Sequence, residues 1–270
     1  MLDRNAPIGV MDGGVGGFTV VKELQKLLPH ENIVYLGDGK NNPYGNRSAE
    51  DIICLTKQCL HFLQEKEVKT VAVACNTISV MIDSYQPDFD FRIFSVVQAG
   101  CEDVLSAGVR EVGVLSTVFT AETGSYAKQI HAINPAIQVY AQGCPKLARL
   151  IENGSFDQEA IDEELRRTLG MLLEEQPQLR ALVLGCTHFP LVRESIERLY
   201  PQLSTIINPA ATQACKVKEY LEANNALNTN GDGWFRVYTT GECETYRTVE
   251  TRLGLRPADF IERVPAPILK

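Results

Sequence analysis

Short, almost wholly apolar runs alternate with longer amphipathic stretches, and this alternation is the strongest constraint on the fold. Such runs are typical of strands that are covered on both faces, as in parallel sheets. The stretches between them have the helical spacing that packs against a sheet. We therefore predict an α/β fold with mainly parallel sheets. The expected strands are Ile8–Met11, Ile33–Leu36, Thr70–Ala74, Arg92–Val96, Glu111–Leu115, Ile137–Tyr140, Ala181–Leu184, Ser204–Ile207 and Trp234–Tyr238.

Two of the amphipathic stretches are well marked. Gly17–Leu28 carries apolar side chains at helical spacing, and Pro29 follows it directly. Asp157–Glu175 begins at a residue type that caps helices. Its apolar positions fall on one helical face. They are Ile161, Leu165, Leu169, Leu172 and Leu173.

A weak internal repeat suggests that the chain folds as two related halves. VKTVAVACNT (Val68–Thr77) resembles LRALVLGCTH (Leu179–His188), and IGVMDGG (Ile8–Gly14) resembles VGVLSTV (Val112–Val118). The two pairs keep the same order at similar offsets, although buried strands also resemble one another by chance. We predict two pseudo-symmetric lobes. The first comprises residues 1–97 plus 209–270, and the second comprises residues 98–208.

The formal net charge of −8 argues against a surface that binds nucleic acid or an anionic membrane. The N-terminal residues lack the apolar core of a signal peptide, and no apolar run reaches membrane-spanning length. A cytoplasmic location is therefore expected. The eight cysteines should then be reduced thiols. None forms a Cys-x-x-Cys pair and only four histidines are present, so no metal site is predicted.

Two cysteines, Cys75 and Cys186, follow directly on apolar strands. Ligands of α/β sheets bind beyond such strand ends. A thiol at a helix N-terminus is expected to have a lowered pKa. If the lobes face each other, the two thiols flank one ligand, an arrangement suited to moving a proton from one face of a carbon to the other. Asp12, at the junction between the first predicted strand and its turn, is positioned to assist Cys75, and His188, two residues after Cys186, could assist that side.

Each of these residues also has a purely structural interpretation. A cysteine at a strand end is more often a packing residue than a reactive one. Asp12 is compatible with a turn, and His188 with the start of a helix. The paired placement of both thiols beside polar residues is what favours chemistry over packing.

The turn Asp12–Gly17, DGGVGG, is rich in glycine but matches neither a dinucleotide fingerprint nor a P-loop. A nucleotide site is therefore the weaker interpretation. We expect instead that the backbone amides of the turn hold a carboxylate of the ligand.

Several motifs together carry a specific resemblance. They are IGVMDGGVGGFTVVKEL, YLGD…PYGNRS, ACNT, GVLST…T, CPKLARLIENG, LGCTHFPL and YTTGE, which are spread over nearly the whole chain. The sequence resembles the glutamate racemases of the aspartate/glutamate racemase superfamily. The resemblance implies two lobes with the active site in the cleft between them, and racemisation without pyridoxal phosphate or another cofactor. It also implies a cytoplasmic homodimer that supplies D-glutamate for peptidoglycan.

Position by position, the resemblance makes Cys75 and Cys186 the two acid/base residues. Asp12 would support Cys75, whereas Glu152 and His188 would support Cys186. The motif alone singles out Glu152, which is otherwise compatible with a solvated helix carboxylate. The residues that would hold the amino-acid substrate are Asp12, Gly13, Pro43, Tyr44, Gly45, Asn76, Thr77, Thr120 and Thr187.

The sequence departs from the family pattern around the substrate and keeps the proton-transfer set. Gly13 stands where the family usually has serine, and Gly39–Asn42 replaces a Thr-Ala-Arg segment. Loss of one hydrogen bond to a charged group costs about 1.5–3 kcal/mol, enough to change substrate preference. Two alternatives therefore stay open beside glutamate racemisation. One is the same chemistry on aspartate or another amino acid, and the other is a non-catalytic ligand-binding protein.

Overall fold

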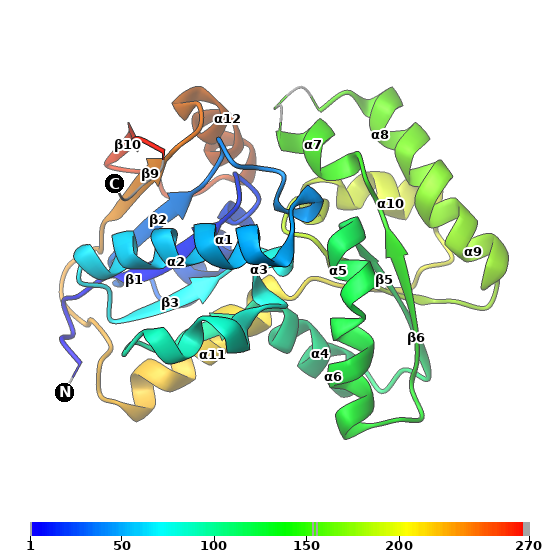
Figure 1. The fold of residues 1–270 in the computed structure, drawn as a ribbon, viewed down its shortest axis with the longest axis horizontal. Coiled ribbons are helices and arrows are strands. Elements are labelled where there is room, and N and C mark those ends of the chain that lie inside the picture. The colour runs from blue at the N-terminus through cyan, green and yellow to red at the C-terminus, as the bar shows by residue number, and fades with distance from the viewer. Residues whose placement is uncertain (1, 153, 155, 267–270) are drawn as a thin grey trace.

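The computed structural model describes residues 2–152, 154 and 156–266, and within them the chain forms two sheets (Figure 1). In this part of the chain the first sheet has the strand order β10-β9-β2-β1-β3-β4, and the second has the order β6-β5-β7-β8. All neighbouring strands are parallel. The strands are β1 (Ile8–Asp12), β2 (Ile33–Gly37), β3 (Thr70–Val73), β4 (Ile93–Ser95), β5 (Glu111–Ser116), β6 (Gln138–Gly143), β7 (Ala181–Gly185), β8 (Thr205–Ile207), β9 (Phe235–Thr239) and β10 (Phe260–Arg263).

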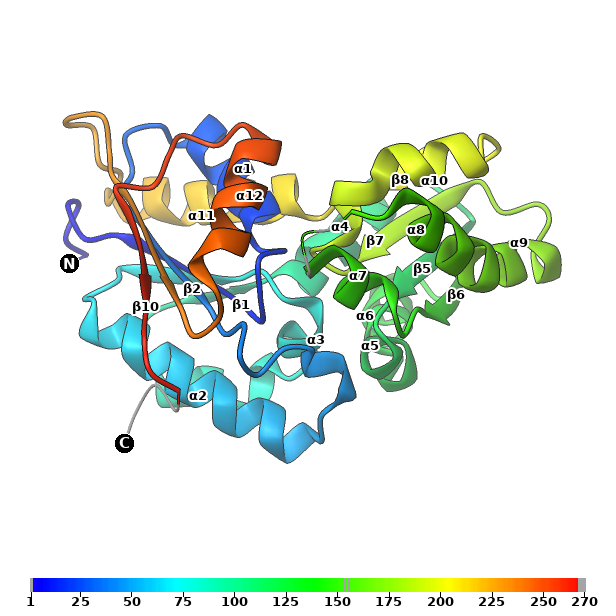
Figure 2. The same ribbon diagram turned by 90° about the horizontal axis from the view of Figure 1, so that it is seen from above.

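Helices cover both faces of each sheet (Figures 1 and 2). On the first sheet, α1 (Phe18–Leu27), α11 (Ala210–Ala223) and α12 (Cys243–Leu253) lie on one face, and α2 (Ala49–Glu65) lies on the other. The remaining helices are α3 (Asn76–Ser79), α4 (Val96–Ser106), α5 (Val118–Thr123), α6 (Ser125–Ile133), α7 (Leu147–Glu152), α8 (Gln158–Leu165), α9 (Met171–Glu175) and α10 (Arg193–Leu199). In the described ranges, none of the helices has the length and apolar character needed to cross a membrane.

The α/β prediction is confirmed, and every predicted strand is present with ends that differ by at most three residues. β10 was not expected. Only the first two residues of its sequence, FIER, are apolar and it lies at the exposed edge of the first sheet, so it lacks the longer apolar run that marks a buried strand. Pairing with β9 in register from Phe260 to Arg263 makes it a strand.

The predicted helix over Asp157–Glu175 is present but not uniform. Asp157 caps it as expected, because its side chain accepts hydrogen bonds from the backbone N–H groups of Glu159 and Ala160. Between α8 and α9 the chain runs through a π-helical turn, Arg166–Gly170. The predicted apolar face is buried throughout.

The internal repeat appears in the topology. The order β2-β1-β3-β4 in the first sheet corresponds to β6-β5-β7-β8 in the second, and the similar sequence segments form the matching strands β1 and β5, and β3 and β7. β9 and β10 extend only the first sheet. The exact division of the chain stays a prediction: the boundary at 97 falls inside α4, and the boundary at 208 lies just before α11. Residues 267–270 of the first lobe, and Asn153 of the CPKLARLIENG motif, lie outside the described residues.

The order of strands in the two sheets sets the position of the site. Asp12 ends β1 and Cys75 follows β3, while Thr117 follows β5 and Cys186 follows β7. Neighbouring parallel strands end at the same edge of a sheet. Asp12 and Cys75 in the first lobe, and Thr117 and Cys186 in the second, therefore come from the ends of two neighbouring strands, whereas Glu152 lies at the end of α7.

Candidate active site

A narrow pocket between the lobes collects most of the residues that the sequence singled out. Its volume is about 20 Å³, which is room for about one water molecule. Both lobes contribute to its walls. The lining residues are Asp12, Gly13, Asn42, Pro43, Tyr44, Gly45, Cys75, Asn76, Thr77, Thr117, Ala148, Cys186, Thr187 and His188.

On one side of the pocket, Cys186, His188 and Glu152 form a chain of contacts. The Cys186 sulfur lies 3.6 Å from His188 Nδ1, and His188 Nε2 lies 2.5 Å from Glu152 Oε2. Burial opposes the charged form of His188, but its hydrogen bonds to Cys186 and Glu152 raise its pKa well above the usual value. The imidazolium so favoured can stabilise negative charge that develops on the Cys186 sulfur.

Glu152 also connects the two lobes. Its Oε2 accepts a hydrogen bond from the backbone N–H of Val15, in the glycine-rich turn of the first lobe, at 3.1 Å. A β-carbon on Gly14 would lie only 2.6 Å from the Glu152 carboxyl carbon, so only glycine allows this approach. Among the residues proposed for catalysis, Glu152 is the one that sequence periodicity alone did not find, because its partners lie far from it along the chain.

Asp12 lies between the two cysteine sides. Its Oδ1 accepts from the Gly14 N–H at 2.9 Å, and its Oδ2 accepts from the Thr187 hydroxyl of the second lobe at 3.0 Å. Burial raises the pKa of Asp12 to about 6, against the opposing effects of the charge of His188 and the hydrogen bonds from Gly14 and Thr187. Asp12 therefore changes charge only a little below neutral pH.

The expectation of a lowered pKa is wrong for Cys75. Burial, together with the charges of Asp12 and Cys186, raises the pKa of Cys75 well above its usual value, although the Ile78 and Gly13 N–H groups favour the thiolate. The helix that begins after Cys75, α3, has only four residues, so its dipole is too weak to offset desolvation. In this structure Cys75 is therefore favoured as a neutral thiol.

Two backbone amides of the glycine-rich turn are already bonded within the protein, and the expectation that the turn holds a ligand carboxylate stays a prediction for its other amides. The Gly14 N–H is bonded to Asp12 and the Val15 N–H to Glu152, so both amides hold carboxylates of the protein. A β-carbon on Gly16 would lie 2.8 Å from His188 Nδ1. The glycines thus let side chains of the second lobe pack directly on the turn.

Polar side chains from both lobes meet at the pocket. The Tyr126 hydroxyl donates to Asn76 Oδ1 at 2.8 Å, and the Thr77 hydroxyl lies 2.9 Å from that of Thr117. Thr120, which was expected to contact the substrate, lies behind the pocket wall. It is buried, and its hydroxyl hydrogen-bonds to Thr117 and Thr77.

Three residues of the pocket wall were not predicted: Asn42, Thr117 and Ala148. Each lies within or next to a motif that carried the resemblance, but none has a residue type that marks chemistry by itself. Thr117 had the best available signal, because it directly follows β5 as Cys186 follows β7. In the described part of the chain, no group of three His, Cys, Asp or Glu side chains is arranged to hold a metal ion.

The ring of Tyr44 occupies the space that a side chain at position 13 would need. A β-carbon at position 13 would lie 2.9 Å from Tyr44 Cδ2. The Tyr44 hydroxyl donates to Asp38 Oδ2 at 2.6 Å, and Asp38 Oδ1 accepts from the Thr240 hydroxyl at the same distance. Asp38 is fully buried, so its hydrogen-bonded carboxylate fixes Tyr44 where the family usually has a serine side chain.

Comparison with known proteins agrees with this geometry. Residues 17–215 match the Asp/Glu/hydantoin racemase family, and the chain belongs to this family of amino-acid racemases. Within it, the chain belongs with the glutamate racemases. It is 40% identical over 245 residues to glutamate racemase 3 of Caldanaerobacter subterraneus subsp. tengcongensis, covering 90% of this chain and 89% of that protein.

Solved structures show the same relationship. The glutamate racemase of Francisella tularensis, in complex with D-glutamate, superposes with a TM-score of 0.87 at 32% identity, over 98% of this chain and 99% of that one. Isoform RacE1 of glutamate racemase from Bacillus anthracis gives a TM-score of 0.89 at 30% identity, with the same coverage. The two-lobed fold and the racemase class are therefore established.

Proposed function

We propose that this racemase interconverts L- and D-glutamate by moving the α-proton between Cys75 and Cys186, without a cofactor. The observation that carries the proposal is the pairing of two unlike thiols across one pocket. Cys75 is favoured as a neutral thiol, whereas Cys186 lies beside the protonated His188. Glutamate is the substrate proposed because relatives that are 37–40% identical and well-superposed structures are glutamate racemases.

The following proton transfers fit the protonation states of the two cysteines. Cys186, as a thiolate beside the imidazolium of His188, removes the α-proton from one face of the substrate. The Cys75 thiol gives its proton to the opposite face. Cys186 is then a thiol and Cys75 a thiolate, which is the state required for the opposite enantiomer. Asp12, with its pKa near 6, is placed to help Cys75 lose its proton, and Glu152 holds His188 in position.

Proton exchange in D₂O tests the reaction. Proton NMR with purified enzyme should show the α-proton signal of either enantiomer of glutamate disappearing, while circular dichroism decays to zero. Retention of the α-proton during complete loss of dichroism would contradict exchange at the thiols.

Substrate choice deserves a separate measurement, because Gly13 and the Gly39–Asn42 segment differ from the family pattern. The same exchange assay with aspartate and other amino acids distinguishes the two candidates. Exchange with glutamate alone would exclude the broader substrate class.

Cellular role and assembly are part of the same proposal. We propose that the D-glutamate formed enters peptidoglycan and that the enzyme acts in the cytoplasm as a homodimer. Light scattering at defined protein concentration tests the assembly, and a monomeric mass at micromolar concentration would contradict the dimer.

The pH dependence of the rate should report Asp12. Because burial raises its pKa to about 6, Asp12 is ionised above this pH and neutral below it. His188, whose pKa is well above the usual value, stays protonated across the same range. We expect kcat/KM at pH 5 to be about tenfold below its plateau above pH 7, equally in both directions. Rate profiles from pH 5 to 8 measure this, and Asp12→Asn should remove the acidic limb.

Substitution of Gly13 should disturb Tyr44. In Gly13→Ala the added carbon crowds the Tyr44 ring, which cannot retreat because Asp38 holds its hydroxyl. We expect a loss of about 1–3 kcal/mol in the free energy of unfolding, typical of overpacking, with a lower kcat/KM. Urea unfolding measures the first effect. In a Tyr44→Phe background the ring is released from Asp38, so Gly13→Ala should lower the free energy of unfolding by a smaller amount. An equal penalty in both backgrounds would show that the ring is not held in this way.

A further inference from the structure

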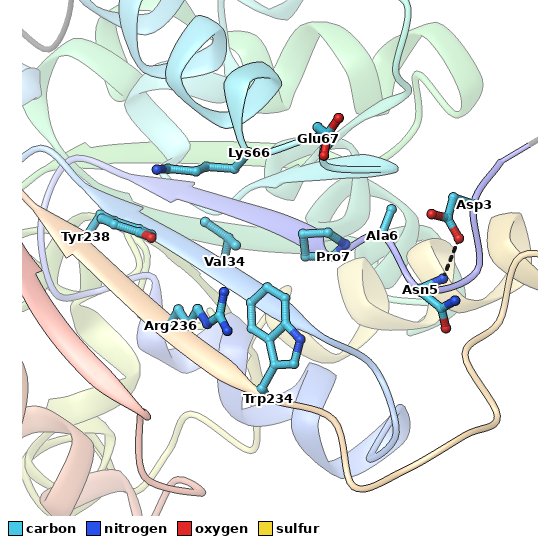
Figure 3. Close-up of a pocket in the computed structure, with 10 residues that line it drawn as sticks. All are labelled: Asp3, Asn5, Ala6, Pro7, Val34, Lys66, Glu67, Trp234, Arg236 and Tyr238. Carbon is cyan, nitrogen blue, oxygen red and sulfur yellow. Dashed lines mark hydrogen bonds between the residues drawn. The ribbon is translucent and has the colours of Figure 1, made fainter.

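A second pocket lies against the first sheet and extends from the segment before β1 along β9 to Tyr238 (Figure 3). Its walls come from the segment before β1, the residues after α2, and the strands β2 and β9. Pro7 lines it just before β1 begins, whereas Asp12 ends the same strand in the active site. The volume of about 420 Å³ is in the range of small-molecule sites.

Two cations, Lys66 and Arg236, line this pocket and lie over aromatic rings. Lys66 Nζ lies 4.7 Å from the centre of the Tyr238 ring, and the Arg236 guanidinium carbon lies 4.1 Å from that of Trp234. Within the described residues, neither cation lies within 4.0 Å of a carboxylate oxygen. Arg236 Nε is buried and has no hydrogen-bond partner among them. Aromatic rings thus hold both cations in place without cancelling their charge.

The opposite end of the pocket offers acceptors. Figure 3 shows Asp3 and Asn5 at the far end from Lys66 and Tyr238, with Asp3 Oδ1 accepting from the Asn5 N–H at 2.9 Å. Glu67 also lines the pocket. Glu67 directly follows Lys66 and lies beside it, so Asp3 and Asn5 are the acceptors at the far end of the pocket from Lys66 and Tyr238.

We propose that this pocket binds a nucleoside monophosphate whose base carries an amino group. The phosphate would lie between Lys66 and Arg236, since an unpaired guanidinium and ammonium suit phosphate oxygens. The base would stack on Trp234. Its amino group would donate to Asp3 and to the side-chain oxygen of Asn5 at the far end, so the carboxylate of Asp3 would face a hydrogen-bond donor and not the phosphate.

The chain offers a direct probe of this site, because Trp234 is its only tryptophan. Adenosine 5′-monophosphate should quench tryptophan fluorescence with a saturating curve. Inorganic phosphate and adenosine, each carrying only half of the recognised groups, should bind at least about tenfold more weakly. Absence of saturable quenching by the monophosphate, or equal binding of adenosine, would overturn the proposal.

Two substitutions test whether the phosphate binds between Lys66 and Arg236. Arg236→Met and Lys66→Met should each weaken adenosine 5′-monophosphate binding about tenfold or more, measured by calorimetry because the substitutions also alter the tryptophan surroundings. Arg193→Met is the matched control, since it removes an exposed arginine that pairs with Glu197 elsewhere. Racemase activity of all three variants shows that they are folded. Wild-type affinity in Arg236→Met, or an equal loss in the Arg193 control, would assign the binding to another place.

Discussion

Replacement of Cys75 by alanine is expected to lower kcat for racemisation by about 10²–10⁴-fold, the range that one positioned acid/base supplies. Cys186→Ala should lower it by a similar factor. The two variants should nevertheless differ in what they retain. With Cys75 removed, Cys186 and His188 can still take the α-proton from one enantiomer and return a solvent deuteron to the same face. We therefore expect α-proton exchange without inversion, for one enantiomer in each variant and for opposite enantiomers in the two.

Proton NMR in D₂O combined with circular dichroism separates exchange from inversion. Cys215→Ala is the matched control, because Cys215 is exposed on α11 and lies outside the active-site pocket. Its rate should equal that of the wild type. Normal racemisation by a Cys75→Ala, Cys186→Ala double variant would refute the two-thiol mechanism.

Lys69→Met is expected to lower the free energy of unfolding by about 3–5 kcal/mol, because it leaves a buried carboxylate without its cation. The side chains of Lys69 and Glu31 are 0% and 1% exposed, and Lys69 Nζ lies 2.6 Å from Glu31 Oε2. The contact is an ion pair without good hydrogen-bond alignment. Lys69 also donates to the backbone oxygens of Arg4 and Ala226, each at 2.9 Å. Lys69, which directly precedes β3, therefore links the start of this strand to the segments that contain Glu31, Arg4 and Ala226.

Urea unfolding of Lys69→Met and Lys57→Met measures the contrast. Lys57 pairs with Asp88 at 2.6 Å, but both side chains are well exposed. Removal of this surface pair should cost less than about 1 kcal/mol. A Lys69→Met, Glu31→Leu double variant should recover part of the stability lost in Lys69→Met, since no unpaired charge remains. Equal losses at the two lysines would show that burial does not set the strength of these pairs.

The sequence predicted the strands well because each buried strand is a local apolar run. It also placed Cys75 and Cys186 at corresponding strand ends, which the topology bears out. It did not predict contacts between distant residues. Val15 and Glu152 are 137 positions apart, and Asp38 and Thr240 are 202 positions apart, so no local pattern reveals them.

The direction of the pKa shift of Cys75 was also mispredicted, because it depends on residues that are distant in the sequence. A strand end followed by a helix predicted a lowered pKa, but burial and the nearby charges of Asp12 and Cys186 decide the direction. Similarly, Gly13 was visible as a departure from the family, whereas the Tyr44 ring that fills its space became visible only in three dimensions. β10 is strand-like through its pairing with β9 and not through its own composition.

The position of Glu152 between the two lobes makes its contacts depend on how closely the lobes approach each other. The same carboxylate oxygen contacts His188 and the backbone of the opposite lobe, so separation of the lobes would break the Val15 contact and leave the Glu152–His188 pair open to water. A pocket of about 20 Å³ must open to admit an amino acid. Under the proposed mechanism, we expect proton abstraction to be weakest while molecules enter and leave, and strongest around a substrate small enough to let the lobes meet again. Selectivity against other amino acids would then depend on closure of the two lobes as much as on direct contacts with the substrate.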